Sequence, residues 1–332
     1  MKKISFSLAV VLCSLLSYGQ TNQVVWNNGR VQYAAPIGNI DSMTYQNRIT
    51  ESDTLFFILP RSAERVVHDT VFIHDTVYIS EDKDDALKGA FSVSADKQVV
   101  FSKGNLQYTQ STKTWGFAEN QYDVIGGANI NNGALADTID LFGWSANNTT
   151  APWGISTSTT TSDYSGDFVD WGKNIGDGNT WRTLSSEEWG YLFNSRTDAS
   201  SKYGVARINL NDDGSKYMNG VIVLPDTWTC PSGITFKSGV ANDLGEQYYA
   251  DYQTFTLSQW EQLEQAGAVF LPAAGRRSGT SVDDVQNRGD YWSSTAYGTV
   301  YAYDVFFYSY YLYPQYADYR NDGRSVRLAQ DL

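Results

Sequence analysis

Residues 301–310 read YAYDVFFYSY, a stretch in which apolar and polar side chains follow the two-residue period of a β-strand. Because successive side chains of a strand point to opposite faces, Val305 and Phe307 share one face. An unpaired carboxylate is costly to bury, so Asp304 is expected to point to solvent and Val305 inward. The stretch therefore predicts a half-buried strand with one aromatic outer face, formed by Asp304, Phe306, Tyr308 and Tyr310.

The outer face is expected to continue into a loop over 313–319 and a turn at 321–322, with Arg324 outward and Val326 inward. Ten of the 23 Tyr lie between residues 291 and 319, and the chain has neither Lys nor Glu between 291 and 328. Tyr offers a large, rigid, amphipathic contact surface at low entropic cost, as in antibody paratopes. The predicted ligand-binding residues are therefore Asp304, Phe306, Tyr308, Tyr310, Tyr313, Tyr316, Asp318, Tyr319, Asn321, Asp322 and Arg324. The alternative is a Tyr-rich antiparallel sheet with ordinary half-buried aromatic side chains.

The composition indicates a folded, acidic protein. The 332 residues carry a formal charge of −13, with 18% charged and 14% aromatic side chains. A disordered chain has the opposite balance. The charge and the lack of a Lys/Arg-rich stretch exclude nucleic acid as a partner and electrostatic binding to anionic lipid.

The N-terminus has the pattern of an export signal. Lys2 and Lys3 precede an apolar run, and small residues at 17 and 19 predict cleavage before Gln20. The alternative is a lipoprotein anchored through Cys13. No later run reaches the ~18 apolar residues of a transmembrane helix, so we expect an exported protein, either on the cell surface or outer membrane or secreted. Cys230 is then the only thiol, which excludes an internal disulfide and a Cys/His zinc site.

Four regions follow from these patterns: a signal peptide over 1–19, a small β module over 20–60, an extended linker or stalk over 61–87 and a compact domain over 88–332. In the module, Asn28-Gly29 predicts a hairpin turn. In the stalk, residues 65–79 contain a six-residue repeat with His68 and His74. The repeat is interpreted as an extended spacer, with self-association or a shared metal site as the alternative.

The compact domain is expected to be α+β, with short antiparallel strands, long loops over 127–180 and two main helices. Ser185 with Glu188 forms a capping-box pattern ahead of the first helix, and Ser258 with Glu261 repeats it ahead of the second.

Several segments of this domain resemble a group of exported proteins from Bacteroidetes-type bacteria. The resemblance extends over nearly the whole domain, and it is carried by six segments, of which the last two are the most specific: 101–108 (FSKGNLQY), 140–144 (DLFGW), 181–185 (WRTLS), 270–275 (FLPAAG), 291–294 (YWSS) and 323–328 (GRSVRL). The chain thus looks like the C-type-lectin-like and major-paralogous-domain group. That group includes the variable proteins of diversity-generating retroelements, whose diversified residues lie at the C-terminus.

The resemblance implies a C-type-lectin-like fold and a surface binding role, as an adhesin or a receptor-like protein, for an unidentified protein or glycan. Tyr, Ser, Asp, Asn and Phe are all reachable from an Asn codon by changing its adenines, which fits diversification by a retroelement. The alternatives are a structural fimbrial or cell-envelope subunit and, more remotely, a carbohydrate-active enzyme.

Sequence motifs for catalysis and for metals are weak. A Ser/His/Asp triad within the domain is excluded because both His lie in the stalk. The acid pairs Glu187/Glu188 and Asp283/Asp284 remain as candidates for glycoside hydrolysis. The calcium-binding tripeptides of sugar-binding lectins are absent. We expect no catalytic residues, no cofactor and no metal site. The adhesion tripeptide Arg288-Gly289-Asp290 is interpreted as a chance match.

Overall fold

The computed structural model describes residues 85–129, 137–176, 180–241 and 248–332 in full, and elsewhere the backbone of several short strands. The chain divides into two units, Met1–Glu81 and Asp82–Leu332. The predictions of a signal over 1–19 and of an assembly or metal-binding element over 65–79 concern side chains outside the described residues.

The first unit contains a small antiparallel sheet in the order β3-β2-β4, formed by β2 (Asn22–Asn27), β3 (Arg30–Pro36) and β4 (Thr54–Phe56). The pairing of β2 with β3 confirms the hairpin predicted at Asn28-Gly29. A further pair joins β1 (Leu8–Ala9) and β5 (Phe72–Ile73).

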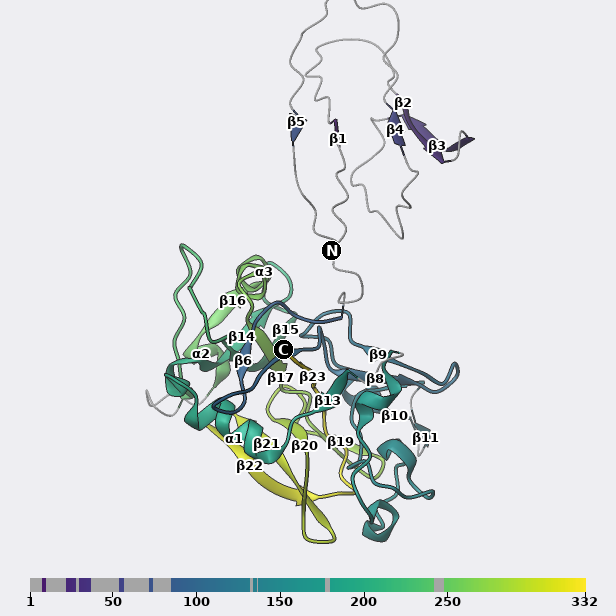
Figure 1. The fold of residues 1–332 in the computed structure, drawn as a ribbon, viewed down its shortest axis with the longest axis vertical. Coiled ribbons are helices and arrows are strands. Elements are labelled where there is room, and N and C mark those ends of the chain that lie inside the picture. The colour runs from purple at the N-terminus through teal and green to yellow at the C-terminus, as the bar shows by residue number, and fades with distance from the viewer. Residues whose placement is uncertain are drawn as a thin grey trace, which may run out of the picture. The chain divides into compact units, whose positions relative to one another are not determined.

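The second unit is an α+β domain dominated by short strands (Figure 1). One four-stranded antiparallel sheet, in the order β13-β23-β7-β6, places the last strand beside an early one and consists of Trp181–Thr183, Leu328–Asp331, Gln98–Phe101 and Phe91–Ser92. Another, in the order β16-β14-β15-β17, consists of Thr254–Thr256, Tyr203–Asn209, Tyr217–Val223 and Val269–Pro272, with β14 and β16 parallel.

The remaining sheets are smaller. The sheet that carries the predicted binding residues has the order β20-β21-β22 and consists of Gly289–Tyr297, Tyr301–Tyr308 and Tyr311–Tyr319. A second has the order β12-β8-β9, with Thr138–Ile139, Leu106–Thr109 and Thr114–Phe117. Two hairpins complete the strands: β18 (Arg276–Ser278) with β19 (Ser281–Asp283), and β10 (Ile130–Asn131) with β11 (Ala134–Leu135).

Three α-helices lie among the described residues: α1 (Ser186–Gly190), α2 (Tyr249–Tyr252) and α3 (Leu257–Gln265). The capping box predicted for α1 is confirmed, because Ser185 and Glu188 satisfy each other's backbone N–H groups. The predicted start of α3 is wrong by two residues, since the N-cap is Thr256 and not Ser258. Thr256 ends β16 with extended backbone, and Gln259 completes its capping box, so Ser258 already lies in the helix.

Three clusters of buried apolar side chains fill the domain. The first packs α1 against the strands beneath it, with Trp189, Tyr291, Val305 and Phe307 among its members. The second includes Trp144, Trp292 and Val326, and the third lies under α3 around Trp260. Burial of Val305, Phe307 and Val326 is thus confirmed, and each such side chain contributes about 1.5–3 kcal/mol.

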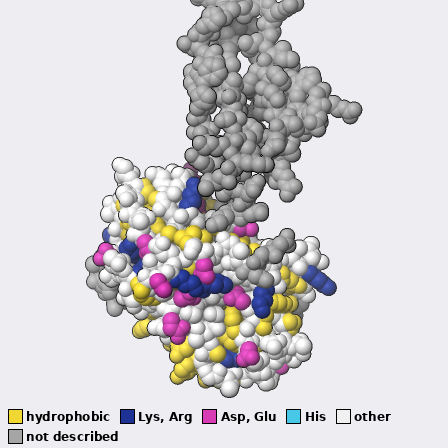
Figure 2. All heavy atoms as spheres, in the orientation of Figure 1, with side chains coloured by type: hydrophobic (Ala, Val, Ile, Leu, Met, Phe, Trp, Pro, Cys, Tyr) yellow, Lys and Arg dark blue, Asp and Glu magenta, His cyan; other side chains and the backbone are white. Residues whose placement is uncertain are grey.

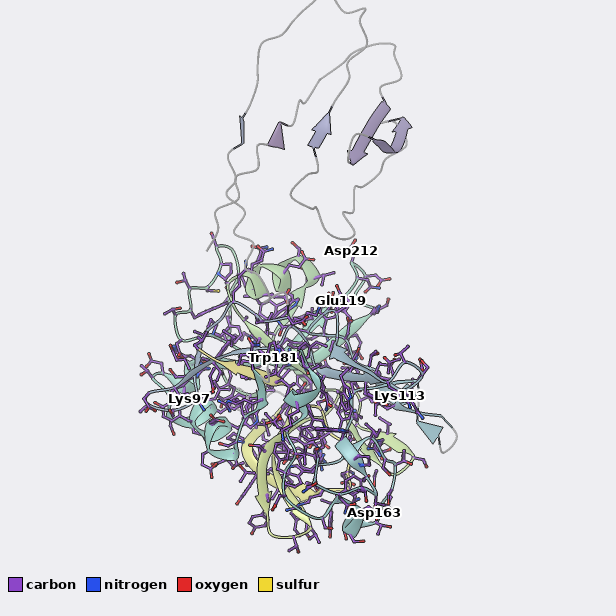
Figure 3. All side chains as sticks on the ribbon, turned by 45° about the vertical axis from the view of Figure 1, so that its right-hand side comes forward. Lys97, Lys113, Glu119, Asp163, Trp181 and Asp212 are labelled. Carbon is purple, nitrogen blue, oxygen red and sulfur yellow. The ribbon has the colours of Figure 1, made fainter. Side chains whose placement is uncertain are left out.

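Irregular segments cover much of the second cluster, as the composition of 127–180 predicts. Short 3-10 turns interrupt them at Pro152–Gly154, Thr161–Tyr164 and Trp171–Asn174. Figure 3 shows Trp181 in the middle of the domain and the labelled charged side chains around its periphery. In the part of the chain that the structure describes, no helix is both long and apolar enough to cross a membrane.

Candidate functional site

Segments that are far apart in the sequence meet behind the β20-β21-β22 sheet. Trp292 on β20 donates its indole N–H to the carbonyl oxygen of Phe142 at 2.7 Å, and Trp144 donates to that of Ser293 at 3.0 Å. Phe142 and Arg324 exchange two backbone hydrogen bonds of 2.9 Å. The sheet therefore rests on a buried, hydrogen-bonded support, which restricts its movement.

The strand predicted over 301–310 ends earlier, at Tyr308. Ser309 and Tyr310 form a two-residue turn, after which Tyr311 pairs with Tyr308. The loop predicted over 313–319 is therefore wrong, because these residues belong to β22. A tight hairpin turn lets the second strand follow at once, and cross-strand aromatic pairs stabilise the ladder.

The register decides which tyrosines share a face, since directly paired residues point to the same side. Phe306 pairs with Tyr313 and Asp304 with Tyr316. Tyr313 and Tyr316 are three residues apart, so in a regular strand their side chains would point to opposite sides. The register is irregular between the pairs Phe306/Tyr313 and Asp304/Tyr316, and this irregularity brings both tyrosines to one side. Tyr319 pairs with Tyr301 and points to the other side. The assignment of Tyr319 to the same binding face is therefore corrected.

We name the aromatic surface at this end of the sheet the tyrosine patch, formed by Tyr308, Tyr310, Tyr311, Tyr313 and Tyr316. Tyr310, Tyr313 and Tyr316 are 44%, 52% and 42% exposed. Neighbouring rings contact one another, with centroids 4.7 Å apart for Tyr310 and Tyr311 and 5.2 Å apart for Tyr311 and Tyr313. Figure 2 shows hydrophobic side chains, Tyr among them, along the lower edge of the domain, where β21 and β22 lie in Figure 1.

Phe306 is the base of the tyrosine patch rather than part of its surface. Its ring lies 4.9 Å from that of Tyr316 and 5.3 Å from that of Tyr311, and it is only 7% exposed. The guanidinium of Arg288 lies 4.1 Å from the ring centre of Phe306. The predicted exposure of Phe306 is wrong because the tyrosines and Arg288 cover it.

Beneath the patch lies a group of buried charges that we name the buried ion cluster: Arg288, Arg324, Asp290, Asp304, Asp318 and Asp322. Arg324 is fully buried, with nitrogen–oxygen distances of 2.7 Å to Asp290 and 3.1 Å to Asp304. It also pairs with Asp318 and, at 3.7 Å, with Asp322. Arg288 binds both carboxylate oxygens of Asp290 at 2.7 Å.

The outward orientations predicted for Asp304 and Arg324 are therefore wrong. The prediction rested on the cost of burying an unpaired carboxylate, but Arg324, twenty residues further along the chain, supplies the partner. Asn321 and Asp322 do lie in a turn, yet both are buried. Asp318 is partly buried through its pairing with Arg288 and Arg324. Burial of Arg288 and Asp290 also makes the adhesion tripeptide inaccessible.

The buried ion cluster contains two guanidinium groups and four carboxyl groups, so its carboxyl groups compete for positive charge. Burial raises the pKa of Asp304 well above its ordinary value, opposed by Arg324 and reinforced by Asp290 and Asp318. The Asp304 oxygens also receive no aligned hydrogen bond from the residues that the structure describes. Burial likewise raises the pKa of Asp322. These shifts favour neutral carboxyl groups and reduce the excess negative charge.

Two phenols of the patch, those of Tyr308 and Tyr311, have raised pKa values. Burial raises the pKa of Tyr311, and the nearby Tyr310 and Tyr308 add to the shift. Burial and the carboxylate of Asp284 raise the pKa of Tyr308, whose hydroxyl lies 3.3 Å from that carboxylate. The hydroxyl groups of these two residues therefore keep their protons more firmly and can both donate and accept hydrogen bonds.

The sequence-based prediction omitted Tyr311, Arg288 and a second tyrosine cluster. Tyr311 is missing from the prediction because the first strand was expected to run to Tyr310; a two-residue turn at Ser309 and Tyr310 would have identified Tyr311 as the first residue of the next strand. The second cluster lies at the other end of the sheet, on its opposite face: Tyr297, Tyr301, Tyr303 and Tyr319. Tyr301 and Tyr303 lie on the same face of β21 as Val305 and Phe307, which is the face predicted to point inward.

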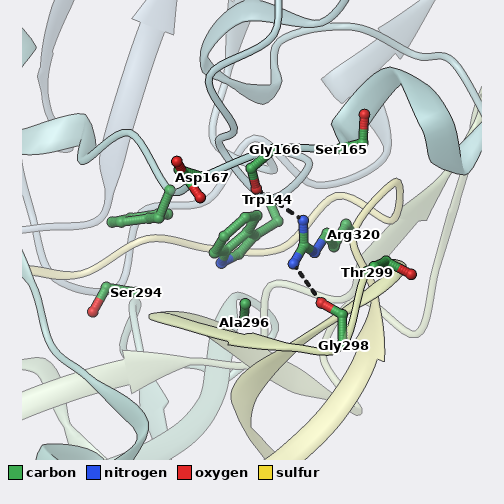
Figure 4. Close-up of a pocket in the computed structure, with 10 residues that line it drawn as sticks. Trp144, Ser165, Gly166, Asp167, Ser294, Ala296, Gly298, Thr299 and Arg320 are labelled. Atoms are coloured by element: carbon green, nitrogen blue, oxygen red, sulfur yellow. Dashed lines mark hydrogen bonds between the residues drawn. The ribbon is translucent and has the colours of Figure 1, made fainter.

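An open groove of about 510 Å³ lies between the β20–β21 turn and the loop over 165–168 (Figure 4). Arg320 joins the two walls by donating to Gly166 O at 3.2 Å and to Gly298 O at 2.8 Å. It also donates to Tyr301 O at 2.9 Å and stacks on Trp144. Because these partners occupy most of the guanidinium, Arg320 mainly stabilises the groove and offers little to a ligand.

The acid pairs considered for catalysis have other partners. Glu188 caps α1 and binds Arg182 through both oxygens, at 2.7 and 2.8 Å, while Glu187 is exposed. Asp284 contacts Tyr308 and lies 3.8 Å from Arg276. Within the described ranges, no group of three or more His, Cys, Asp or Glu side chains is placed to hold a metal ion.

Comparison of the chain with protein-family models, with curated proteins and with solved structures finds no match.

Proposed function

We propose that this protein is an exported, surface-associated binding protein, with a C-type-lectin-like domain that holds its ligand on the tyrosine patch. The ligand is a protein or a glycan, and binding involves no covalent chemistry. The C-terminal motifs that carry the resemblance support this proposal, as does their position behind the patch. Export is supported by the signal pattern at the N-terminus of the sequence.

The observation that carries the proposal is the combination of exposed rings with a fixed base. Tyr310, Tyr313 and Tyr316 are each more than 40% exposed, and the rings of Tyr313 and Tyr316 contact a Phe306 that is only 7% exposed. Exposed aromatic groups of this kind mark interaction surfaces on soluble proteins more often than chance. Tyr is also among the residues that dominate measured binding energies.

The fixed base matters for affinity because binding costs free energy whenever mobile side chains become ordered, about 0.5–1.5 kcal/mol for each. The patch tyrosines already contact one another and Phe306, so less freedom remains to be lost. Buried charges hold β20, β21 and β22 together beneath them. A rigid scaffold with variable exposed side chains is also the arrangement that diversification by a retroelement would require.

The proposal is tested with a triple variant, Tyr310→Ala, Tyr313→Ala and Tyr316→Ala, of the full chain. Wild-type and variant proteins are labelled and applied to arrays of immobilised glycans and of extracellular proteins. We expect the wild type to bind a defined subset of probes and the variant to lose that binding. Because all three side chains are exposed, the melting temperature should change little.

Tyr297→Ala is the matched control, because Tyr297 is 52% exposed but lies at the other end of the sheet. It should bind the same probes as the wild type. If the triple variant and the wild type bind identical probes equally well, the patch is not the binding surface. If the triple variant unfolds at a much lower temperature, the tyrosines serve the core instead.

A further inference from the structure

The basic side chains of the C-terminal third of the chain are almost all buried. The last Lys of the sequence is Lys237, and six Arg follow it. Five of these have at most 6% exposure: Arg277, Arg288, Arg320, Arg324 and Arg327. The sixth, Arg276, is partly exposed and pairs with Asp284 at 3.8 Å. This region therefore uses its positive charges inside the fold and presents very few of them to a partner.

Acidic side chains remain exposed around the patch. Asp284, about one-third exposed, contacts the hydroxyl of Tyr308, and the preceding residue, Asp283, is exposed. Asp283 forms no salt bridge with any of the described residues, whereas Asp284 has Arg276 at 3.8 Å. Beside Tyr308, the patch therefore borders two carboxylates and one guanidinium, which together carry a net negative charge.

Neutral tyrosine rings attract cations, because the face of an aromatic ring carries partial negative charge. This chain uses the same contact internally: the guanidinium of Arg207 lies 3.8 Å from the ring centre of Tyr217, and that of Arg288 lies 4.1 Å from Phe306. On the patch, the outer faces of Tyr310, Tyr313 and Tyr316 are available for such a contact. Nearby carboxylates add a second attraction for the same groups.

We propose that the tyrosine patch takes Lys and Arg side chains, so that its partner is a basic segment of another protein. The inference rests on the proposed function and specifies the chemistry of the ligand. Ring faces take the cationic groups and their alkyl stems, and the surrounding carboxylates steer the segment into place. Anionic partners are repelled by the same carboxylates.

The test measures fluorescence anisotropy of a labelled, short oligolysine peptide titrated with the full chain. An oligoglutamate peptide and a Gly/Ser peptide of equal length serve as comparisons. We expect the wild type to bind oligolysine and neither of the two comparison peptides. The Tyr310→Ala, Tyr313→Ala, Tyr316→Ala variant should bind oligolysine with an affinity lower by about tenfold or more. This variant keeps the net charge of the protein, so its loss cannot come from general attraction to an acidic chain.

Two further variants complete the design. Tyr297→Ala should bind oligolysine as the wild type does, and Asp283→Asn with Asp284→Asn should weaken binding and reduce its dependence on salt. Equal affinity of the wild type and the triple variant for oligolysine would overturn the inference, as would no binding of oligolysine at all. If Tyr-dependent binding on the arrays goes to neutral glycans or acidic proteins instead, the inference fails while the proposed function stands.

Discussion

Replacing Arg324 with Met tests whether the buried ion cluster fixes the sheet beneath the patch. The change removes the guanidinium that lies 2.7 Å from Asp290 and 3.1 Å from Asp304, and it leaves a side chain of similar length. Removing one partner of a buried ion pair costs about 3–5 kcal/mol, because the other charge stays buried without compensation. Here two further carboxyl groups, those of Asp318 and Asp322, pair with the same guanidinium, so the cost should lie in the upper part of that range, about 4–5 kcal/mol.

For a domain of about 250 residues, 1 kcal/mol corresponds to roughly 2–4 °C in melting temperature. We therefore expect Arg324→Met to lower the melting temperature of the full chain by about 8–20 °C, measured by circular dichroism at neutral pH. Arg276→Met is the matched control, because Arg276 is 37% exposed and its partner lies 3.8 Å away. An exposed pair contributes at most about 1 kcal/mol. A loss for Arg324→Met no larger than that for Arg276→Met would refute the assignment of Arg324 as the centre of a buried ion cluster.

Two further predictions concern the same region. The raised pKa of Asp304 means that the folded protein keeps a proton which the unfolded chain releases above about pH 4, so stability should fall as pH rises toward the folded-state pKa. Asp304→Asn cannot lose that proton, and urea unfolding at pH 5, 7 and 9 should show a smaller decline than in the wild type; parallel declines would contradict the shift. Phe306→Ala should cost about 3 kcal/mol and alter the near-ultraviolet circular dichroism of the tyrosines, because it removes the base of the patch. Tyr313→Ala, at an exposed position, should cost less than about 1 kcal/mol, and equal losses for the two variants would show that Phe306 is not the base.

Local features whose cause lies within a few residues could be predicted from the amino-acid sequence. The two-residue period around Val305 and Phe307 identified a strand and the residues that it buries. Ser185 and Glu188 identified the start of α1, because a capping box needs only one helical turn. The pattern of few helices and many short strands identified an α+β domain. The density of tyrosines near the C-terminus also located the aromatic surface.

Which polar groups are buried depends on contacts that form only in the folded domain. Alternation along β21 separates two faces but does not say what covers each of them, and Asp304 is buried because Arg324 lies opposite it after folding. The faces of Tyr316 and Tyr319 depend on an irregular register between two strands, and a shift of one residue exchanges them. Two capping patterns compete at the start of α3, Thr256 with Gln259 and Ser258 with Glu261. The helix uses the first of them, directly at the end of β16. Charge pairing, register and cap choice each depend on residues brought together by folding, so their outcome is not contained in any single stretch of the sequence.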